Sequence, residues 1–270
     1  MDVSRAPHSV PRIDTTVSHS ARIWDYWLGG KENYPVDREL GDRIAGVLPD
    51  IVEQARADRL FLGRVVRHLA ETEGIRQFLD IGTGLPTADN THEVAQRAAP
   101  DARVVYVDND PLVLAHARAL LTSTPQGRTD YLDADLRDPE LILKGAEATL
   151  DLSRPVAVTM LGVVWHVPDD AEARSIIGRL MEPLAPGSFL AVAHPTTEVT
   201  GERMADAIRQ WNRFGTPRGV HRTPERIAGL FAGLELVEPG VVSCTRWRPE
   251  ALPFGEPAEI DQFCGVARKP

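Results

Sequence analysis

The stretch Gln77-Phe78-Leu79-Asp80-Ile81-Gly82-Thr83-Gly84-Leu85-Pro86 decides the fold. It begins with a short apolar run, which is typical of a buried strand, and passes directly into a turn that carries Gly82 and Gly84. Glycines let the backbone turn sharply close to a ligand, and the freed N–H groups can bind an anion. The stretch therefore predicts a strand that ends in a ligand-binding turn, although a GxG pair alone is also typical of a simple tight turn.

Further apolar runs, separated by helical segments, follow along the chain. They predict strands at 103–108, around 131–132, at 155–161 and at 188–193. Strands that are apolar nearly throughout and alternate with helices form parallel sheets covered on both faces. The last two predicted strands, near 234–242 and at 261–267, have no clear helix between them, so we expect an antiparallel final pair. The predicted fold class is α/β, with a doubly wound, mostly parallel sheet.

The pattern divides the chain into three regions. Residues 1–13 are polar and contain proline, which is typical of a flexible tail. Residues 14–74 form a predicted helical N-terminal extension, because Leu62, Val65, Val66 and Leu69 repeat with the spacing of one helix face. Residues 75–270 form the predicted main domain.

Composition excludes several classes of protein. The net charge of the 270 residues is −9, and an acidic surface repels phosphate backbones, so we expect no nucleic-acid partner. Cys244 and Cys264 cannot form a CxxC metal site, and no metal is predicted. The sequence has no secretory apolar segment and no run of ~18–20 apolar residues that could span a membrane, so we expect a cytoplasmic protein without a membrane partner.

Acidic residues follow the predicted strands at the edge where a doubly wound sheet binds its ligand. Asp108 ends the second strand, where an acid can accept both hydroxyls of a ribose; a turn carboxylate is the alternative. Asp135 and Leu136 follow the third strand, where the acid can accept from the amine of adenine while Leu136 covers the ring. A solvated acidic loop is the alternative there. Together these residues predict an adenosine-type cofactor.

The glycine turn, the two acids and the segment Leu184–Leu190 resemble the class I S-adenosylmethionine (SAM)-dependent methyltransferases. More narrowly, the chain from about Ile13 to Lys269 resembles an uncharacterised, actinobacterial-type group of methyltransferases. The segments that carry this resemblance are Arg22–Asn33, Asp80–Thr87 and Trp165–Asp170. The resemblance implies a Rossmann-like sheet of seven strands with an antiparallel last strand. It also implies SAM as the cofactor and in-line methyl transfer to a small-molecule acceptor.

The resemblance further implies which residues surround the cofactor. From the methionine part through ribose and adenine to the methyl group they are Asp80, Gly82, Thr83, Gly84, Asp108, Asn109, Asp135, Leu136, Leu161 and Gly162. Asp80 would face the amino group. The third glycine that is common in the wider class is replaced by Leu85-Pro86, which leaves the loop contacts open.

The N-terminal segment Arg22–Asn33 is dense in aromatic residues. As a helical lid it would bring Arg22 to the methionine carboxylate and aromatic faces such as that of Tyr26 to the sulfonium cation. The alternative is an amphipathic helix that packs its aromatic residues on the sheet edge.

Two histidines follow strands near the expected methyl donor. His166 could serve as a general base for a hydroxyl or nitrogen nucleophile, or it could be structural, and His194 has the same two interpretations. The locally basic stretch from Arg203 to Arg222 could bind an anionic acceptor, but a solvated helix face is the simpler interpretation.

Two alternative functions stay open at this point. A nicotinamide-dependent oxidoreductase would also use the GxG turn and Asp108, but it has no reason for the Asp135-Leu136 pair, and the sequence contains no Tyr-x-x-x-Lys pair. A SAM-binding protein without transferase activity would keep the whole pattern. The sequence leaves the oligomeric state open.

Overall fold

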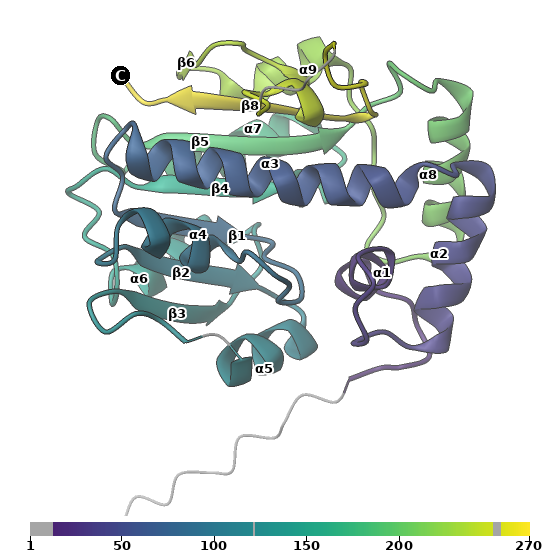
Figure 1. The fold of residues 1–270 in the computed structure, drawn as a ribbon, viewed down its shortest axis with the longest axis horizontal. Coiled ribbons are helices and arrows are strands. Elements are labelled where there is room, and N and C mark those ends of the chain that lie inside the picture. Colours follow the sequence, from purple (N-terminus) through teal and green to yellow (C-terminus); the bar gives the residue numbers. More distant parts are fainter. Residues whose placement is uncertain (1–12, 121, 251–254) are drawn as a thin grey trace, which may run out of the picture.

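In a computed structural model, the structure describes residues 13–120, 122–250 and 255–270 (Figure 1). Residues 1–12 of the predicted tail lie outside this part of the chain. The α-helices are α1 Ser20–Trp27, α2 Pro35–Val47, α3 Ile51–Glu71, α4 Thr91–Ala98, α5 Pro111–Leu120, α6 Pro139–Ala146, α7 Asp170–Met181, α8 Glu202–Phe214 and α9 Pro224–Ala228. Among the described residues, no helix combines the length and the apolar character that crossing a membrane requires.

The strands form one mixed sheet. Their bounds are β1 Gln77–Ile81, β2 Arg103–Asp108, β3 Arg128–Asp133, β4 Ala157–Leu161, β5 Phe189–Pro195, β6 Glu235–Leu236, β7 Val242–Ser243 and β8 Gln262–Arg268. Their order in space is β3-β2-β1-β4-β5-β8-β6, and β7 also pairs with β8. The first five strands are parallel, and β8 runs antiparallel to β5. The predicted doubly wound sheet and antiparallel last strand are confirmed.

The number of strands differs from the seven that the resemblance implied, because the sheet has eight in the described part of the chain. The segment predicted as one strand near 234–242 is divided into the two short strands β6 and β7. Pro239 and Gly240 lie between them, and the Gly240 N–H donates to the Val237 carbonyl to close a turn. Proline has no N–H to give to a strand ladder, so the segment cannot continue as one strand.

Alternating side chains of the central strands bury both faces of the sheet. Leu79 and Ile81 of β1 pack with α6 and α7 on one face, in a cluster that includes Ile142 and Ile177. Phe78 points to the other face and packs with the apolar side of α3. That side includes the residues whose spacing predicted the helix, and all of them are buried. The predicted helix is therefore confirmed, and burial on both faces explains why the strands are apolar nearly throughout.

The carboxyl ends of the parallel strands meet at one end of the molecule. β1 lies between β2 and β4, so the strand order reverses at this point, and such a switch point opens a crevice at the carboxyl ends. Helices α1 and α2 lie beyond this end of the sheet, and α3 runs from there across one face (Figure 1). α1, α2 and α8 share an apolar cluster with Trp165 from the segment after β4.

A buried arginine ties the segment after β4 to the rest of the fold. Arg222 has no exposed surface, and its guanidinium donates to the Asp170 carboxylate at 2.8 Å and to the Val167 carbonyl at 2.6 Å. It also donates to His194 Nε2 at 2.6 Å. A buried charge needs such a complete set of partners, and this set fixes the 3₁₀ helix Val164–His166 beside the end of the sheet.

Removal of this guanidinium is expected to destabilise the fold. Arg222→Ala leaves the buried carbonyl and His194 without their donor, and we expect a loss of about 3–5 kcal/mol in the free energy of unfolding. Arg226→Ala is the matched control, because Arg226 binds the same Asp170 carboxylate but is half exposed. It should cost about 0–1 kcal/mol. Urea denaturation measures both, and equal losses would contradict the assigned role of Arg222.

Candidate functional site

A cavity of about 220 Å³ lies at the carboxyl ends of β1, β2 and β4. It is bounded by the turn after β1, the loops after β2, β3 and β4, and residues of α1 and α3. The predicted site residues that line it are Asp80, Gly82, Thr83, Gly84, Asp108, Asn109, Asp135, Leu136, Leu161, Gly162 and His166. The structure thus brings together all the predicted positions except Arg22 and Tyr26.

The glycine turn after β1 is held by the acid that ends β2. Asp108 accepts a hydrogen bond from the Gly84 N–H at 3.0 Å and another from the Asp110 N–H at 2.9 Å. Gly82 adopts φ +74°, and a Cβ atom on it would lie only 2.4 Å from the Val163 side chain. Only glycine therefore fits at this position, where two loops approach each other.

Asp80 is buried at the end of β1 and accepts two hydroxyl hydrogen bonds. Thr91 Oγ1 donates at 2.6 Å and Thr159 Oγ1 at 2.8 Å. Burial raises the pKa of Asp80, and these two hydrogen bonds oppose part of that rise. Burial likewise raises the pKa of Asp108, against the two backbone hydrogen bonds that it accepts. Hydrogen bonds thus fix the orientation of each carboxylate, but they compensate only part of the cost of burying its negative charge.

Asp135 and Leu136 form the far end of the cavity. Asn109 Nδ2 donates to the Asp135 carboxylate at 3.1 Å, which joins the loops after β2 and β3. Leu136 is buried and belongs to the core cluster under the sheet. This end of the cavity combines a hydrogen-bonding edge with an apolar side chain.

His166 lines the cavity as a neutral imidazole. Its Nδ1–H donates to the Arg218 carbonyl at 3.0 Å, and burial lowers its pKa to about 4. Within the described part of the chain, Nε2 has no hydrogen-bond partner, so its lone pair is available. His194 differs: its Nδ1–H donates to the Pro195 carbonyl and its Nε2 accepts from Arg222, so it is structural and lies outside the cavity lining.

The structure does not bring Arg22 and Tyr26 to the cavity. The Arg22 guanidinium is buried against the Asp37 carboxylate, with Nε 3.2 Å from Oδ2, and also donates to the Asp14 and Val17 carbonyls. The Tyr26 hydroxyl donates to Asp42 at 2.6 Å on the surface. Both side chains are on the faces of α1 that pack away from the strands, so helical spacing places Trp24 and Asp25 in the lining instead.

The N-terminal motif has a structural basis in Asp25. Its carboxylate accepts from the Glu32 N–H at 2.9 Å and from Asn33 Nδ2 at 2.7 Å, which closes the loop after α1. A Cβ atom on Gly30 would lie 1.9 Å from the Asp25 carboxylate, so this loop requires glycine there. Residues of the segment Arg22–Asn33 thus close the loop after α1 among themselves, and α1 presents Trp24 and Asp25 to the cavity.

Two arginines of the basic stretch from Arg203 to Arg222 have partners within the protein. The buried Arg222 guanidinium forms an ion pair with Asp170. Arg209 pairs with Glu202 and Asp206 at the surface. None of the arginines of this stretch lines the cavity. The simpler interpretation, of solvated and paired charges, holds for Arg209.

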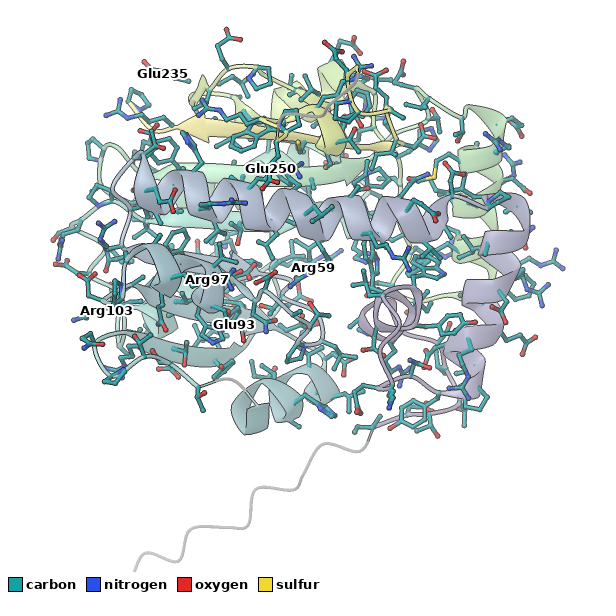
Figure 2. The ribbon with its side chains drawn as sticks, viewed as in Figure 1. Arg59, Glu93, Arg97, Arg103, Glu235 and Glu250 are labelled. Atoms are coloured by element: carbon teal, nitrogen blue, oxygen red, sulfur yellow. The ribbon has the colours of Figure 1, made fainter. Side chains whose placement is uncertain are left out.

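The sequence interpretation missed two charged residues of α3 that line the cavity, Asp58 and Arg59. Asp58 is buried and accepts from Gln262 Nε2 at 3.1 Å. Arg59 extends from α3 toward the segment before α4, where it donates to the Ala88 carbonyl at 3.2 Å (Figure 2). The sequence did carry a signal for Asp58, which lies four residues before Leu62 on the apolar face of the helix. An acid on a buried helix face is rare and is typical of a functional site.

The lining has an excess of buried negative charge. Burial raises the pKa of Asp58 to about 6 and also raises that of Asp25. Within the described ranges, four lining acids form no ion pair with a Lys, Arg or His side chain: Asp25, Asp58, Asp80 and Asp108. A cationic ligand would compensate these carboxylates. The part of the chain that the structure describes holds no cluster of His, Cys, Asp or Glu suited to a metal ion.

The chain matches a known protein family over nearly its whole length. Residues 6–270 match the family model for S-adenosyl methyltransferases. The chain therefore belongs to this family, an assignment that favours SAM over a nicotinamide cofactor. None of the curated proteins matches the sequence.

Solved structures agree with this assignment. A DUF574 family protein from Streptomyces avermitilis is 47% identical, with a TM-score of 0.91 over 96% of this chain and 100% of that chain. A proposed methyltransferase from Thermobifida fusca is 40% identical, with a TM-score of 0.85 over 95% of this chain and 96% of that chain. An O-methyltransferase family protein from Burkholderia thailandensis, 18% identical with a TM-score of 0.52 over 83% of this chain and 62% of that chain, shares the fold.

The buried acid of α3 is expected to make stability depend on pH. The folded-state pKa of Asp58, about 6, lies above the usual value of 3.8, so the folded protein binds the proton more tightly than the unfolded chain. The stability that this proton contributes is complete below pH ~4 and is lost as the pH rises through 6. Asn cannot titrate, so Asp58→Asn does not lose this stability. As the pH rises from 4 to 8, the free energy of unfolding of the variant should increase by about 1–3 kcal/mol relative to that of the wild type.

Urea denaturation at both pH values measures this difference. Glu53→Gln, at an exposed position of the same helix, is the control and should follow the wild type at both pH values. A constant difference between Asp58→Asn and the wild type across this range would show that the Asp58 carboxyl titrates like an exposed acid.

Proposed function

We propose that the cavity holds SAM and that the enzyme transfers the methyl group by in-line displacement to a small-molecule acceptor. In this proposal the methionine part lies over Gly82, Thr83 and Gly84, and Asp80 faces its amino group. The ribose binds Asp108 beside Asn109, and the adenine lies between Asp135 and Leu136. Leu161 and Gly162 flank the methyl group. The observation that carries the proposal is that one cavity collects a glycine turn and acids that end or follow the strands β1, β2 and β3.

The chemistry of the lining fits this cofactor. SAM carries an ammonium and a sulfonium, and the buried acids without ion-pair partners supply the opposite charge. Its carboxylate needs a donor, and Arg59 takes the place that the sequence assigned to Arg22, because Arg59 lines the cavity. The aromatic face of Trp24 can attract the sulfonium.

The N-terminal extension, residues 14–74, acts in this proposal as a lid on the cofactor. α1 contributes Trp24 and Asp25 to the cavity, and α3 contributes Asp58 and Arg59. Both helices belong to the predicted extension, whereas the strands belong to the predicted main domain at 75–270. Such a cover would exclude water from the reacting groups.

Bound SAM supplies an activated methyl group, so the protein needs to supply mainly alignment. Two lining groups can take a proton from the acceptor. His166 Nε2 is unprotonated, but its pKa of about 4 makes it a weak base at neutral pH. The Asp58 carboxylate, with a pKa of about 6, is better matched to that task, and we propose Asp58 as the base in place of His166.

The proposed ribose contact predicts a loss of cofactor affinity when the acid is removed. Asp108→Ala removes two charge-assisted acceptor oxygens and frees the Gly84 turn, so SAM should bind roughly 10- to 100-fold more weakly. Calorimetric titration with SAM, with its demethylated product S-adenosylhomocysteine (SAH) and with NAD measures this effect. The wild type should bind SAM and SAH but not NAD.

Asp133→Ala is the matched control, because Asp133 ends the neighbouring strand in register with Asp108 but does not line the cavity. It should bind SAM as the wild type does. Wild-type affinity in Asp108→Ala would remove Asp108 from the site, and NAD binding without a SAM response would overturn the proposed function. Release of SAH from SAM in the presence of metabolites of the native host would identify the acceptor.

A further inference from the structure

A second, apolar pocket adjoins the cofactor cavity. Its volume is about 50 Å³, and residues of α1, α2, α3 and α8 line it together with the segment after β4. Four of the five tryptophans of the chain are in this lining: Trp24, Trp27, Trp165 and Trp211. Aromatic side chains at such density, next to a reactive centre, form a binding surface for apolar or aromatic groups.

The two pockets meet at the end of β4. Trp24 and Gly162 line both of them. A Cβ atom on Gly162 would lie 3.9 Å from Trp24 and 4.0 Å from Gln262 Nε2, so these three residues surround the junction. Gly162 is also the position proposed to flank the methyl group. A molecule in the second pocket would therefore point toward the transferred methyl.

Of the residues that the structure describes, none that lines the second pocket is charged. Its polar side chains are Gln54 and Gln262, while the indole N–H groups of Trp27 and Trp211 donate to backbone carbonyls. Burial of an ion there would carry a desolvation cost without a compensating partner. An amide can still hydrogen-bond a hydroxyl or an amine. The lining thus disfavours charged molecules and favours an apolar molecule that carries one hydroxyl or amine group.

We propose that this pocket binds the methyl acceptor, and that the acceptor is an uncharged small molecule with a compact alkyl or aromatic body. The inference rests on the proposed function, because it places the acceptor's nucleophilic oxygen or nitrogen at the junction beside Gly162. That atom forms a bond to the methyl carbon while the carbon–sulfur bond breaks and its electron pair stays on sulfur. The acceptor's proton passes to the Asp58 carboxylate, which lines the cofactor cavity and accepts a hydrogen bond from Gln262 of the second pocket.

The size of the pocket restricts the acceptor further. A cavity of about 150 Å³ can enclose benzene, and this pocket is about a third of that size. It therefore encloses an alkyl group or one edge of a ring, and the rest of the acceptor extends into the junction. Bulky fused rings do not fit without a change in the lining.

Calorimetric titration of the full chain can test the proposal in two steps. The first step is titration with SAH, which tests the proposed function alone. The second is titration of the SAH-saturated protein with phenol as the uncharged probe and with benzoate and glycine as charged probes. Phenol should bind at least tenfold more tightly than either charged probe.

Two variants of α8 locate the probe. Ala207 is buried in the pocket lining, and Ala207→Leu fills the pocket, so phenol affinity should fall at least tenfold while SAH affinity stays at the wild-type value. Ala205→Leu makes the same change on the same helix outside the lining and should leave both affinities unchanged. Met204→Ala enlarges the pocket and should improve binding of the bulkier probe 1-naphthol.

The outcomes separate the two proposals. Failure to bind SAH would overturn the proposed function, and this inference with it. With SAH bound, equal affinities for phenol and benzoate would overturn the inference alone. Unchanged phenol binding in Ala207→Leu would also overturn it, since the phenol would then lie elsewhere. Retained SAH binding in that variant shows that it is folded, so a loss of phenol binding supports the assigned pocket.

Discussion

The hydrogen bond from the Gly84 N–H to the Asp108 carboxylate is the interaction on which the site depends. It joins the turn after β1 to the end of β2, next to the point where the strand order reverses. Asp80, at the end of β1, likewise joins neighbouring elements. Its hydrogen bonds with Thr91 and Thr159 connect α4 and β4 to β1. The sheet thus places carboxylates before any ligand arrives, which is the preorganisation that tight and oriented binding requires.

The N-terminal helices supply two of the four acids without an ion pair that line the cavity in the described part of the chain. They bury Asp25 and Asp58 against the open end of the sheet, where both carboxyl groups have raised pKa values. These acids would be a cost to stability in a protein whose cavity had no cationic ligand. In the proposed complex with SAM, the sulfonium and ammonium groups would compensate that cost.

Much of the fold and site follows from local sequence, and the misses have physical reasons. The turn from Gly82 to Gly84 and the acids after β2 and β3 were predictable, because each lies directly after an apolar strand. Arg22 was misplaced, because nothing local reveals that Asp37, fifteen residues away, captures its guanidinium. To predict Asp58 as a site residue, one must know how the long helix α3 is positioned against the sheet. The division of β6 from β7 depends on the single turn at Pro239 and Gly240.

The central claim is that this crevice binds an adenosyl sulfonium cofactor, and a crystal structure of the full chain with SAH tests it most directly. The account predicts density for the ribose hydroxyls within hydrogen-bond distance of the Asp108 carboxylate and for the adenine beside Leu136. SAH bound elsewhere, or a crevice in which Trp24 fills the ribose position with SAH present at saturation, would contradict it.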